Sequence, residues 1–261
     1  MIFAKVDPAA LATVEAIMLD KYKAEPFHNL YLLSGERPRT HAYGGTCSDK
    51  ALSFLHAARQ AGFDARLHSG YIGGKEIHRL VKLSINGRSF FADVGNGWPA
   101  LKLYPLDGET MYSCFEMRFR TEIVGGRMTV FHRKHGVEAR QLEIDLEGKP
   151  EREIEADIAA RFDSGIEYPF SNSLRFSRVV EDRFLFLRGE RLEIDGSGAF
   201  EVVEGIDAAR VPGVLREYFG FDIQSLRSPP AGSAEGSCNS ARASRETSGQ
   251  ADTHGSPAPC R

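Results

Sequence analysis

Cysteine is scarce and irregularly spaced in this chain: there are four cysteines among 261 residues, and none forms a CxxC pair. That spacing gives no sign of a disulfide framework or a zinc ribbon. Long apolar runs are also missing, since no stretch approaches the roughly 18 residues of a membrane-spanning helix. Lys and Arg (33) nearly balance Asp and Glu (36), so bulk charge argues against nucleic-acid and membrane partners. Residues 1–7 lack the order of a signal peptide, and we therefore expect a cytoplasmic protein.

The last part of the chain contains little that could form a core. From Ser228 to Arg261, 21 of 34 residues are Ser, Gly, Ala or Pro, and Leu, Ile, Val, Met and aromatic residues are absent. Such a segment has no apolar surface to offset the entropy of ordering, so we expect residues 228–261 to be a disordered tail. Two of the cysteines, Cys238 and Cys260, lie in it. The remaining residues have the composition of a globular protein.

The hydrophobic pattern predicts helices first, strands in the middle and a mixed end, which indicates an α+β fold. We expect helices from Pro8 to about Tyr22, and at Thr46–Gly62, Glu151–Phe162 and Ala208–Phe219. We expect strands at Ala65–Ile72, His78–Ile85, Arg88–Val94, Phe115–Val124, Arg127–His132, Glu138–Asp145, Phe184–Ile194 and Ala199–Val203. No internal repeat is evident.

Cys47 occupies the first turn of a predicted helix. Gly44 and Gly45 mark a sharp turn before it, Thr46 can cap the helix, and Asp49 is an imperfect capping-box partner. A thiolate at a helix N-terminus is stabilised by the helix dipole and by unpaired N–H groups. Cys47 is therefore a candidate nucleophile, although a lone cysteine at a helix start is commonly a small buried apolar residue.

Asn86-Gly87 between two apolar runs predicts a two-residue hairpin turn. Counting back along the ladder sets Leu80 opposite Asp93, which makes His78 and Asp93 diagonal neighbours on one face of the sheet. Diagonal positions lie about 7–8 Å apart, close enough for an imidazole and a carboxylate to form a hydrogen bond. Such a carboxylate would orient the imidazole and favour its charged form. The pair is either structural or part of a catalytic site.

Cys47, His78 and Asp93 together would suit acyl transfer through a thioester. We expect no catalytic or metal-binding role for the other candidate residues. His132 and His135 form an HxxH whose spacing does not bring both imidazoles to one metal, so we expect surface residues and no metal. Cys114 alternates in a strand-like run and is interpreted as a core residue, and Trp98-Pro99 is interpreted as a strand terminator.

Several stretches resemble the arylamine N-acetyltransferase family. The resemblance lies in Pro26-Phe27-His28-Asn29-Leu30, Gly44-Gly45-Thr46-Cys47, His78-Arg79-Leu80-Val81 and Asp93-Val94-Gly95-Asn96-Gly97, with weaker matches at 170–178, 187–192 and 215–223. It implies that Cys47 accepts the acetyl group, that His78 is its base and that Asp93 orients His78. It also implies acetyl-CoA as co-substrate and a small aromatic amine as acceptor.

The resemblance further implies an architecture and binding residues. The expected division is a helical lobe at 1–64 carrying the nucleophile, a β-barrel lobe at 65–150 carrying His and Asp, and an α/β lid at 151–227, around a core similar to that of papain and transglutaminases. CoA would lie along Gly95, Asn96 and Gly97, and Phe27 would line the acceptor pocket. The sequence does not indicate an oligomeric state.

The chain also departs from the family pattern. Tyr43 stands where Arg is common, Asn96 where an aromatic residue is usual, and Cys47 is followed by Ser-Asp-Lys-Ala rather than x-Glu/Gln-x-Asn. In addition, Arg66 to Tyr71 looks like transglutaminase-like proteins. Two alternatives therefore stay open: a transglutaminase-like acyltransferase, amide synthase or amidohydrolase acting on peptide or carrier-bound acyl groups, and a catalytically silent binding protein.

Overall fold

The computed structural model of this chain describes residues 7–163, 167–196 and 198–226. The expected disordered tail, residues 228–261, lies outside them. The helices are α1 (Pro8–Ala24), α2 (Leu30–Ser34), α3 (Cys47–Gln60), α4 (Glu151–Ala160) and α5 (Val211–Phe219), with 3-10 turns η1 (His41–Tyr43) and η2 (Ile223–Leu226). Within the described ranges, no helix combines the length and apolarity needed to cross a bilayer.

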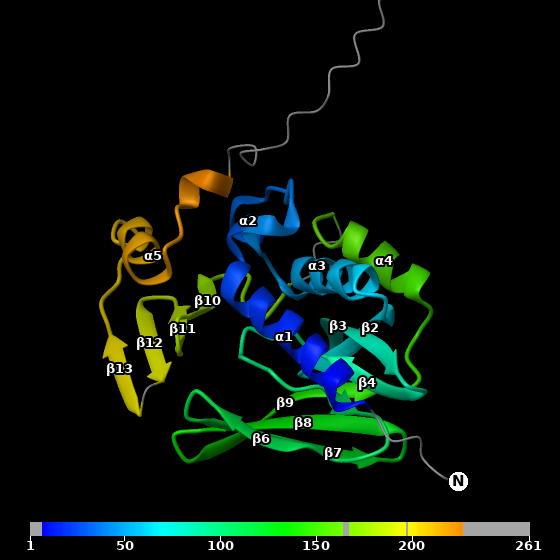
Figure 1. Cartoon of the computed structure of the whole chain (residues 1–261). Helices are drawn as coiled ribbons and strands as arrows, with labels where there is room; N and C mark the ends of the chain where they lie inside the picture. Colours follow the sequence, from blue (N-terminus) through cyan, green and yellow to red (C-terminus); the bar gives the residue numbers. More distant parts are fainter. Residues whose placement is uncertain (1–6, 164–166, 197, 227–261) are drawn as a thin grey trace, which may run out of the picture. The chain divides into compact units, whose positions relative to one another are not determined.

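Two antiparallel sheets organise the described residues, and the fold is mixed α+β as predicted (Figure 1). The larger sheet has the order β5-β4-β3-β2-β9-β8-β7-β6, and the smaller one β1-β10-β11-β12-β13. The larger sheet contains β2 (Asp64–Ile72), β3 (Lys75–Ile85), β4 (Arg88–Ala92), β5 (Tyr104–Pro105), β6 (Met111–Cys114), β7 (Met117–Val124), β8 (Arg127–Lys134) and β9 (Val137–Asp145). The smaller sheet contains β1 (Phe27–His28), β10 (Arg175–Val180), β11 (Arg183–Arg188), β12 (Arg191–Gly196) and β13 (Ala199–Val203).

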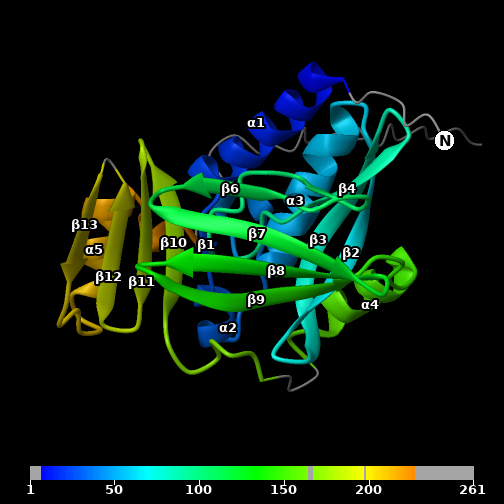
Figure 2. The same ribbon diagram turned by 90° about the horizontal axis from the view of Figure 1, so that it is seen from below.

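Helices cover both sheets. α3 packs on β2 and β3 of the larger sheet, beside which it lies in both views (Figure 2), and α1 packs on α3 and on β10 of the smaller sheet. Their apolar residues, including Val14, Met18 and Phe54, join the largest core cluster. α5 buries Leu215 and Phe219 in a second cluster with residues of the smaller sheet. The helical stripe after Asp7 is therefore explained by burial on one side of α1.

The hairpin between β3 and β4 has the predicted register. Ile85 pairs with Arg88, and the two turn residues have φ values of 52° at Asn86 and 80° at Gly87. Both values are positive, as a type I′ turn requires. The hairpin therefore sets Ala92, at the end of β4, opposite Val81 in the middle of β3, and α3 packs on β3. Asp93, directly after β4, continues toward the first half of β3, where His78 lies.

Element boundaries differ from the sequence predictions where turns interrupt apolar runs. Gly189 has a φ of 57° and divides the expected strand Phe184–Ile194 into β11 and β12. Phe115 and Glu116 have φ values of 46° and 59°, so they form a turn between β6 and β7 rather than the beginning of a strand. The short elements β1 and α2, and strand β10, were not predicted, since their pattern is too short or is set by distant pairing.

Candidate active site

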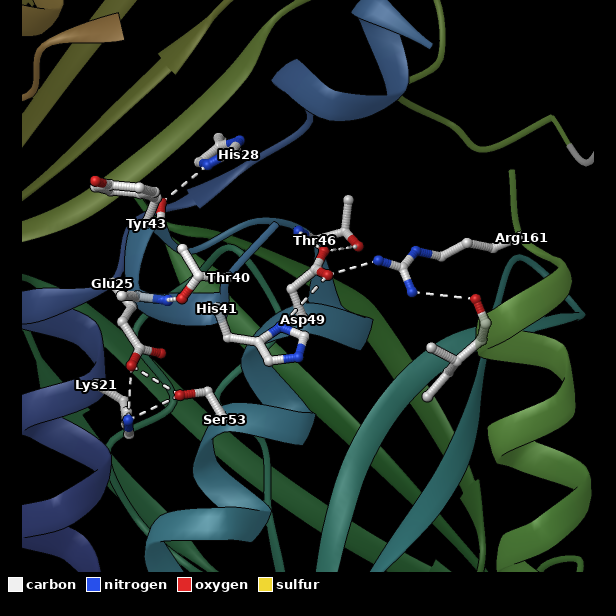
Figure 3. Close-up of polar contacts among 12 residues, drawn as sticks. Lys21, Glu25, His28, Thr40, His41, Tyr43, Thr46, Asp49, Ser53 and Arg161 are labelled. Carbon is white, nitrogen blue, oxygen red and sulfur yellow. Dashed lines mark hydrogen bonds and ion pairs between the residues drawn. The ribbon is translucent and has the colours of Figure 1, made fainter. Parts of the chain in front are cut away.

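The first turn of α3 holds Cys47 with a buried capping network. The Thr46 amide donates to Asp49 Oδ2 over 3.0 Å, within a complete capping box. Asp49 Oδ1 accepts from Arg161 at the end of α4, 2.5 Å away, and lies 3.7 Å from His41 Nδ1 (Figure 3). Asp49 is only 1% exposed, so its carboxylate stabilises the first turn of α3, which carries Cys47, and does not contact solvent. The capping prediction is confirmed; Arg161 was not foreseen.

Gly95 allows the loop after β4 to approach Cys47 closely. A Cβ at position 95 would lie 2.6 Å from the Cys47 Cα, a distance that real Cβ atoms do not adopt. Any side chain there would push the loop off the first turn of α3. The glycine therefore brings the segment that carries Asp93 against the turn that carries the thiol.

His78 and Asp93 form a buried hydrogen-bonded pair. His78 Nε2 lies 2.8 Å from Asp93 Oδ1, and the two side chains are 2% and 0% exposed. Burial disfavours the imidazolium, but the Asp93 charge and hydrogen bond, with the nearby Cys47, outweigh it and raise the pKa of His78 to about 10. The diagonal contact predicted from the hairpin is present. Because Nε2 faces Asp93, Nδ1 is the nitrogen left for the thiol.

Asp93 is itself held by neutral groups. Its Oδ2 accepts from Asn96 Nδ2 over 2.7 Å, and Asn96 Oδ1 accepts from Gln141 Nε2 over 2.6 Å. The backbone oxygen of Asp93 accepts from the Tyr22 hydroxyl, 2.7 Å away. Both carboxylate oxygens thus have partners, and the network runs from β9 through Asn96 and Asp93 to His78.

The pKa of Cys47 is lowered although its side chain is buried. Burial by itself raises a thiol pKa, but the hydrogen bond and positive charge of His78 outweigh it, assisted by the charge and backbone amide of Arg79. The Cys47 Sγ also lies 3.7 Å from the Ile77 carbonyl oxygen, on β3. The contact with His78 thus favours ionisation of the Cys47 thiol, and a thiolate is the form in which a cysteine attacks a carbonyl carbon.

A cavity of about 270 Å³ opens at this pair. Cys47, His78, Gly95 and Asn96 line it, and the remainder of its wall is mainly aromatic or basic. The aromatic lining residues are Phe27, Trp98, Phe170 and Phe186, and the basic ones are Arg140, Arg175 and Arg188. The ring centroids of Phe27 and Phe170 are 5.9 Å apart in an edge-to-face contact. The cavity therefore places aromatic walls beside the Cys47 sulfur.

Of the three residues expected to contact CoA, two line the cavity, and Gly97 is not among its lining residues. Gly95 and Asn96 line it, but the Asn96 amide is engaged by Asp93 and Gln141. The carbonyl oxygen of Gly97 accepts from the Ser177 hydroxyl over 2.7 Å. The assignment of these three residues to CoA stays a prediction, as does that of Phe27 to the acceptor.

Two interpretations from the sequence need correction. His132 is half-buried, with its ring 5.1 Å from that of Trp98 at the cavity wall, and so it is not a surface residue. Trp98 likewise lines the cavity as well as following a strand. His135 instead lies 3.5 Å from Asp195. Over the described ranges, no group of three or more His, Cys, Asp or Glu side chains is placed to hold a metal.

Cys114 is half-buried, and its Sγ lies 3.2 Å from the Pro99 carbonyl oxygen. Its side chain packs against the largest core cluster, in agreement with its interpretation as a core residue. Burial raises the pKa of this thiol to about 12. Cys114 therefore lacks the ionised form that nucleophilic attack requires.

Several site residues were missed because their partners are distant in the sequence. Gln141 lies 45 residues from Asn96, and Arg161 lies 112 residues from Asp49. Nothing local in the sequence marks either one. Arg79 adjoins His78 within the matched stretch His-Arg-Leu-Val, and this adjacency was the one available signal of its role.

Comparison with known proteins agrees with this geometry. A family model described as N-acetyltransferase matches residues 10–227, while a search of curated proteins gives no match. An arylamine N-acetyltransferase structure from Nocardia farcinica is 22% identical and has a TM-score of 0.71, covering 88% of this chain and 90% of that one. The structure from Mycobacterium marinum in complex with CoA is 19% identical with a TM-score of 0.70, covering 86% and 91%.

The arylamine N-acetyltransferase of Mycobacterium smegmatis is similarly related, at 21% identity and a TM-score of 0.69, covering 87% of this chain and 90% of that one. Identities this low establish a shared fold, whereas the family model spans most of the chain. Members of the family are acetyltransferase enzymes. The chain therefore belongs to the arylamine N-acetyltransferase family.

Proposed function

We propose that this protein transfers an acetyl group from acetyl-CoA to an aromatic amine through a thioester on Cys47. The single observation that carries the proposal is the buried array in which His78 contacts both Cys47 and Asp93 at the base of an aromatic-lined cavity. The membership of the family and the CoA complex of the M. marinum relative support the choice of donor.

The first half-reaction follows from the charges of the site. The Cys47 thiolate attacks the carbonyl carbon of the acetyl thioester, and backbone amides at the start of α3, ahead of the Asp49 amide that the capping box satisfies, can stabilise the oxyanion. The carbon–sulfur bond to CoA breaks, and the CoA thiolate takes the proton of the His78 imidazolium. Acetyl-Cys47 and a neutral His78 remain.

The second half-reaction reverses these roles. The amine nitrogen attacks the acetyl carbon, and neutral His78 accepts the proton that the nitrogen loses. The thioester bond breaks, which restores the Cys47 thiolate beside the His78 imidazolium. Asp93 holds the imidazole through Nε2 in both steps, so that Nδ1 faces the reacting atoms.

We also propose the lobe division expected from the sequence, at residues 1–64, 65–150 and 151–227, around a papain-like core. It is supported by the placement of Cys47 on a helix and of His78 and Asp93 on an antiparallel hairpin packed beneath that helix. A cytoplasmic location and the absence of a metal requirement stay predictions.

Mass spectrometry of the intact protein tests the function. Acetyl-CoA alone should add one acetyl group to the wild type and to Cys114→Ser, and none to Cys47→Ser. Adding an aromatic amine should then remove the acetyl group and yield the amide. Acetylation that survives Cys47→Ser, or release of acetate without amide formation, would contradict the proposal; the second outcome would favour a thioesterase-like role.

A further inference from the structure

The segment 93–100, directly after β4, carries several parts of the active site. Its first residue, Asp93, contacts His78, and near its other end Trp98 lines the cavity. The segment itself contains neither helix nor strand. Its conformation therefore depends on hydrogen bonds that other elements make to its backbone.

Side chains from three elements hold this segment. Three successive carbonyl oxygens each accept a hydrogen bond from one of them: Gly97 from Ser177 on β10, Trp98 from Tyr22 on α1, and Pro99 from Cys114 on β6. The donors come from both sheets and from the first helix, so the segment is tied to different parts of the fold.

Tyr22 differs from the other two donors because its hydroxyl reaches both ends of the segment. Its Oη lies 2.7 Å from the Asp93 carbonyl oxygen and 2.9 Å from that of Trp98, and it accepts from the Ala100 amide over 3.1 Å. A hydroxyl can donate one proton and still accept. Burial and the charge of Asp93 raise the pKa of Tyr22, so the hydroxyl keeps that proton. The two ends of the segment thus meet at one oxygen atom.

The helix that carries Cys47 also fixes the position of Tyr22. The Tyr22 side chain packs in the largest core cluster, and Lys50 Nζ lies 5.2 Å from the centre of its ring. Lys50 is buried on α3, three residues after Cys47, and donates to the carbonyl oxygens of Lys21 over 3.0 Å and Glu25 over 2.5 Å, at the end of α1. The place that the Tyr22 hydroxyl reaches is therefore set relative to the nucleophile.

We infer that Tyr22 is a positioning residue of the active site, whose hydroxyl joins the two ends of the 93–100 segment and thereby keeps the Asp93 carboxylate on His78. The inference rests on the proposed function, since it gives Tyr22 a part in keeping Cys47 ionised. If the Asp93 backbone is released, the carboxylate moves away from His78, and the imidazolium loses the charge that stabilises it. The sulfur then loses the positive charge beside it, so the pKa of Cys47 rises.

Tyr22→Phe tests the inference, because it removes the hydroxyl and keeps the ring in the core. The rate at which iodoacetamide alkylates Cys47 is measured as a function of pH. We expect the midpoint to rise by about one pH unit, which slows alkylation about tenfold on the acid side of the profile. The fluorescence of Trp98, the one tryptophan of the chain, should become easier to quench with acrylamide, because the other end of the segment is released as well.

Ser177→Ala is the matched control. It removes a hydroxyl that donates to the same segment over 2.7 Å, from a side chain as deeply buried as Tyr22, both being 3% exposed, but it leaves the contact with Asp93 in place. The midpoint should therefore stay at the wild-type value. A rise as large as that in Tyr22→Phe would overturn the inference, since any loosening of the segment would then be sufficient. An unchanged midpoint in Tyr22→Phe would overturn it too, whatever happens to Trp98.

A double variant tests whether Tyr22 acts through Asp93. Asp93→Asn removes the carboxylate charge and should itself raise the midpoint. Adding Tyr22→Phe to Asp93→Asn should then raise it no further, because residues that act along one chain of contacts are not additive. Additive rises would refute the positioning role, since Tyr22 would then affect the thiol by another route.

The inference and the proposed function can fail separately, because iodoacetamide requires neither acetyl-CoA nor an amine. If wild-type Cys47 takes no acetyl group from acetyl-CoA, the proposed function fails, and the pH profiles still decide whether Tyr22 positions Asp93. If Cys47 is acetylated in the wild type but Tyr22→Phe keeps the wild-type pH profile, only the role of Tyr22 is wrong.

Discussion

The surroundings of Cys47 and Cys114 show opposite effects on the same chemical group. Burial opposes ionisation at both thiols, yet the pKa of Cys47 is lowered and that of Cys114 is raised to about 12. The difference is the positive charge beside Cys47, supplied by His78 and Arg79. Burial alone therefore suppresses ionisation of a thiol, and a positive charge beside the buried sulfur favours it.

Two buried histidines, His28 and His78, also have pKa values shifted in opposite directions; here burial lowers the pKa, whereas it raises that of a thiol. His78 and His28 are 2% and 0% exposed, but the pKa of His78 is raised to about 10 and that of His28 is lowered to about 4. Burial lowers the pKa of His28, and the hydrogen bond of its Nε2 with the neutral carbonyl oxygen of Tyr43, at 3.0 Å, does not offset it. Burial disfavours the charged form of His78 as well, but the Asp93 carboxylate outweighs it. At equal burial, the charge of the partner therefore decides the direction of the shift.

Removing His78 should produce the largest change. In His78→Ala the burial of Cys47 is no longer outweighed, so the thiol pKa rises toward or above its free value of about 8.5. Alkylation of Cys47 by iodoacetamide at pH 6, followed by peptide mass spectrometry, should slow by about a hundredfold or more, since its rate follows the thiolate fraction. The wild type should keep its reactivity down to lower pH, because a lowered pKa preserves the thiolate there.

His56→Ala is a matched control, since His56 lies on the exposed side of α3 and should react as the wild type does. Cys114 provides an internal reference in every sample. A His78→Ala protein that still alkylates rapidly at pH 6, or a wild type in which Cys114 reacts as fast as Cys47, would break the comparison between the two thiols.

Local signals were sufficient to predict the pairing of His78 with Asp93. Asn86-Gly87 fixes the turn, and strand periodicity then fixes which residues share a face; the glycines and Thr46 likewise fix the start of α3. These features depend on a few consecutive residues, whose conformational preferences follow from the residue types alone.

Long-range pairing could not be read in the same way. Arg175 lies opposite Arg188 because β10 pairs with β11, and β10 itself shows too little alternation of apolar and polar residues to be predicted. Arg161 reaches Asp49 across the chain, and Gln141 reaches Asn96 from another strand. Which of many polar residues meets a given carboxylate depends on the packing of whole elements, so the supporting network became visible only in three dimensions.

A smaller effect is expected from the groups that hold Asp93. Asn96→Ala removes the donor to Asp93 Oδ2, and a hydrogen bond to a charged group contributes about 1.5–3 kcal/mol. We expect kcat to fall by about tenfold with little change in KM for acetyl-CoA, and alkylation of Cys47 to slow in parallel. Gln141→Ala, which acts through Asn96, should show a weaker form of the same change.

Iodoacetamide makes this experiment decisive because it needs no CoA site. If Asn96→Ala raises KM for acetyl-CoA and leaves alkylation of Cys47 unchanged, Asn96 contacts the co-substrate, as the sequence resemblance implies, and its role in positioning Asp93 is wrong. Parallel losses in kcat and in alkylation would instead place Asn96 in the network that maintains the ion pair.

The lowered pKa of the buried His28 predicts that the folded state loses stability at acid pH. The unfolded chain protonates His28 near pH 6.5, whereas the folded chain does so only near pH 4. The folded state therefore binds fewer protons in this range, and stability from a neutral His28 is complete above pH 6.5 and is lost as the pH falls toward 4. The shift corresponds to about 3 kcal/mol. Urea unfolding measures the unfolding free energy at pH 7 and at pH 4.5. The difference between the two pH values should be smaller for His28→Gln than for the wild type, whereas the control His56→Gln should keep the wild-type difference. Equal differences for all three proteins would show that protonation of His28 does not destabilise the folded state.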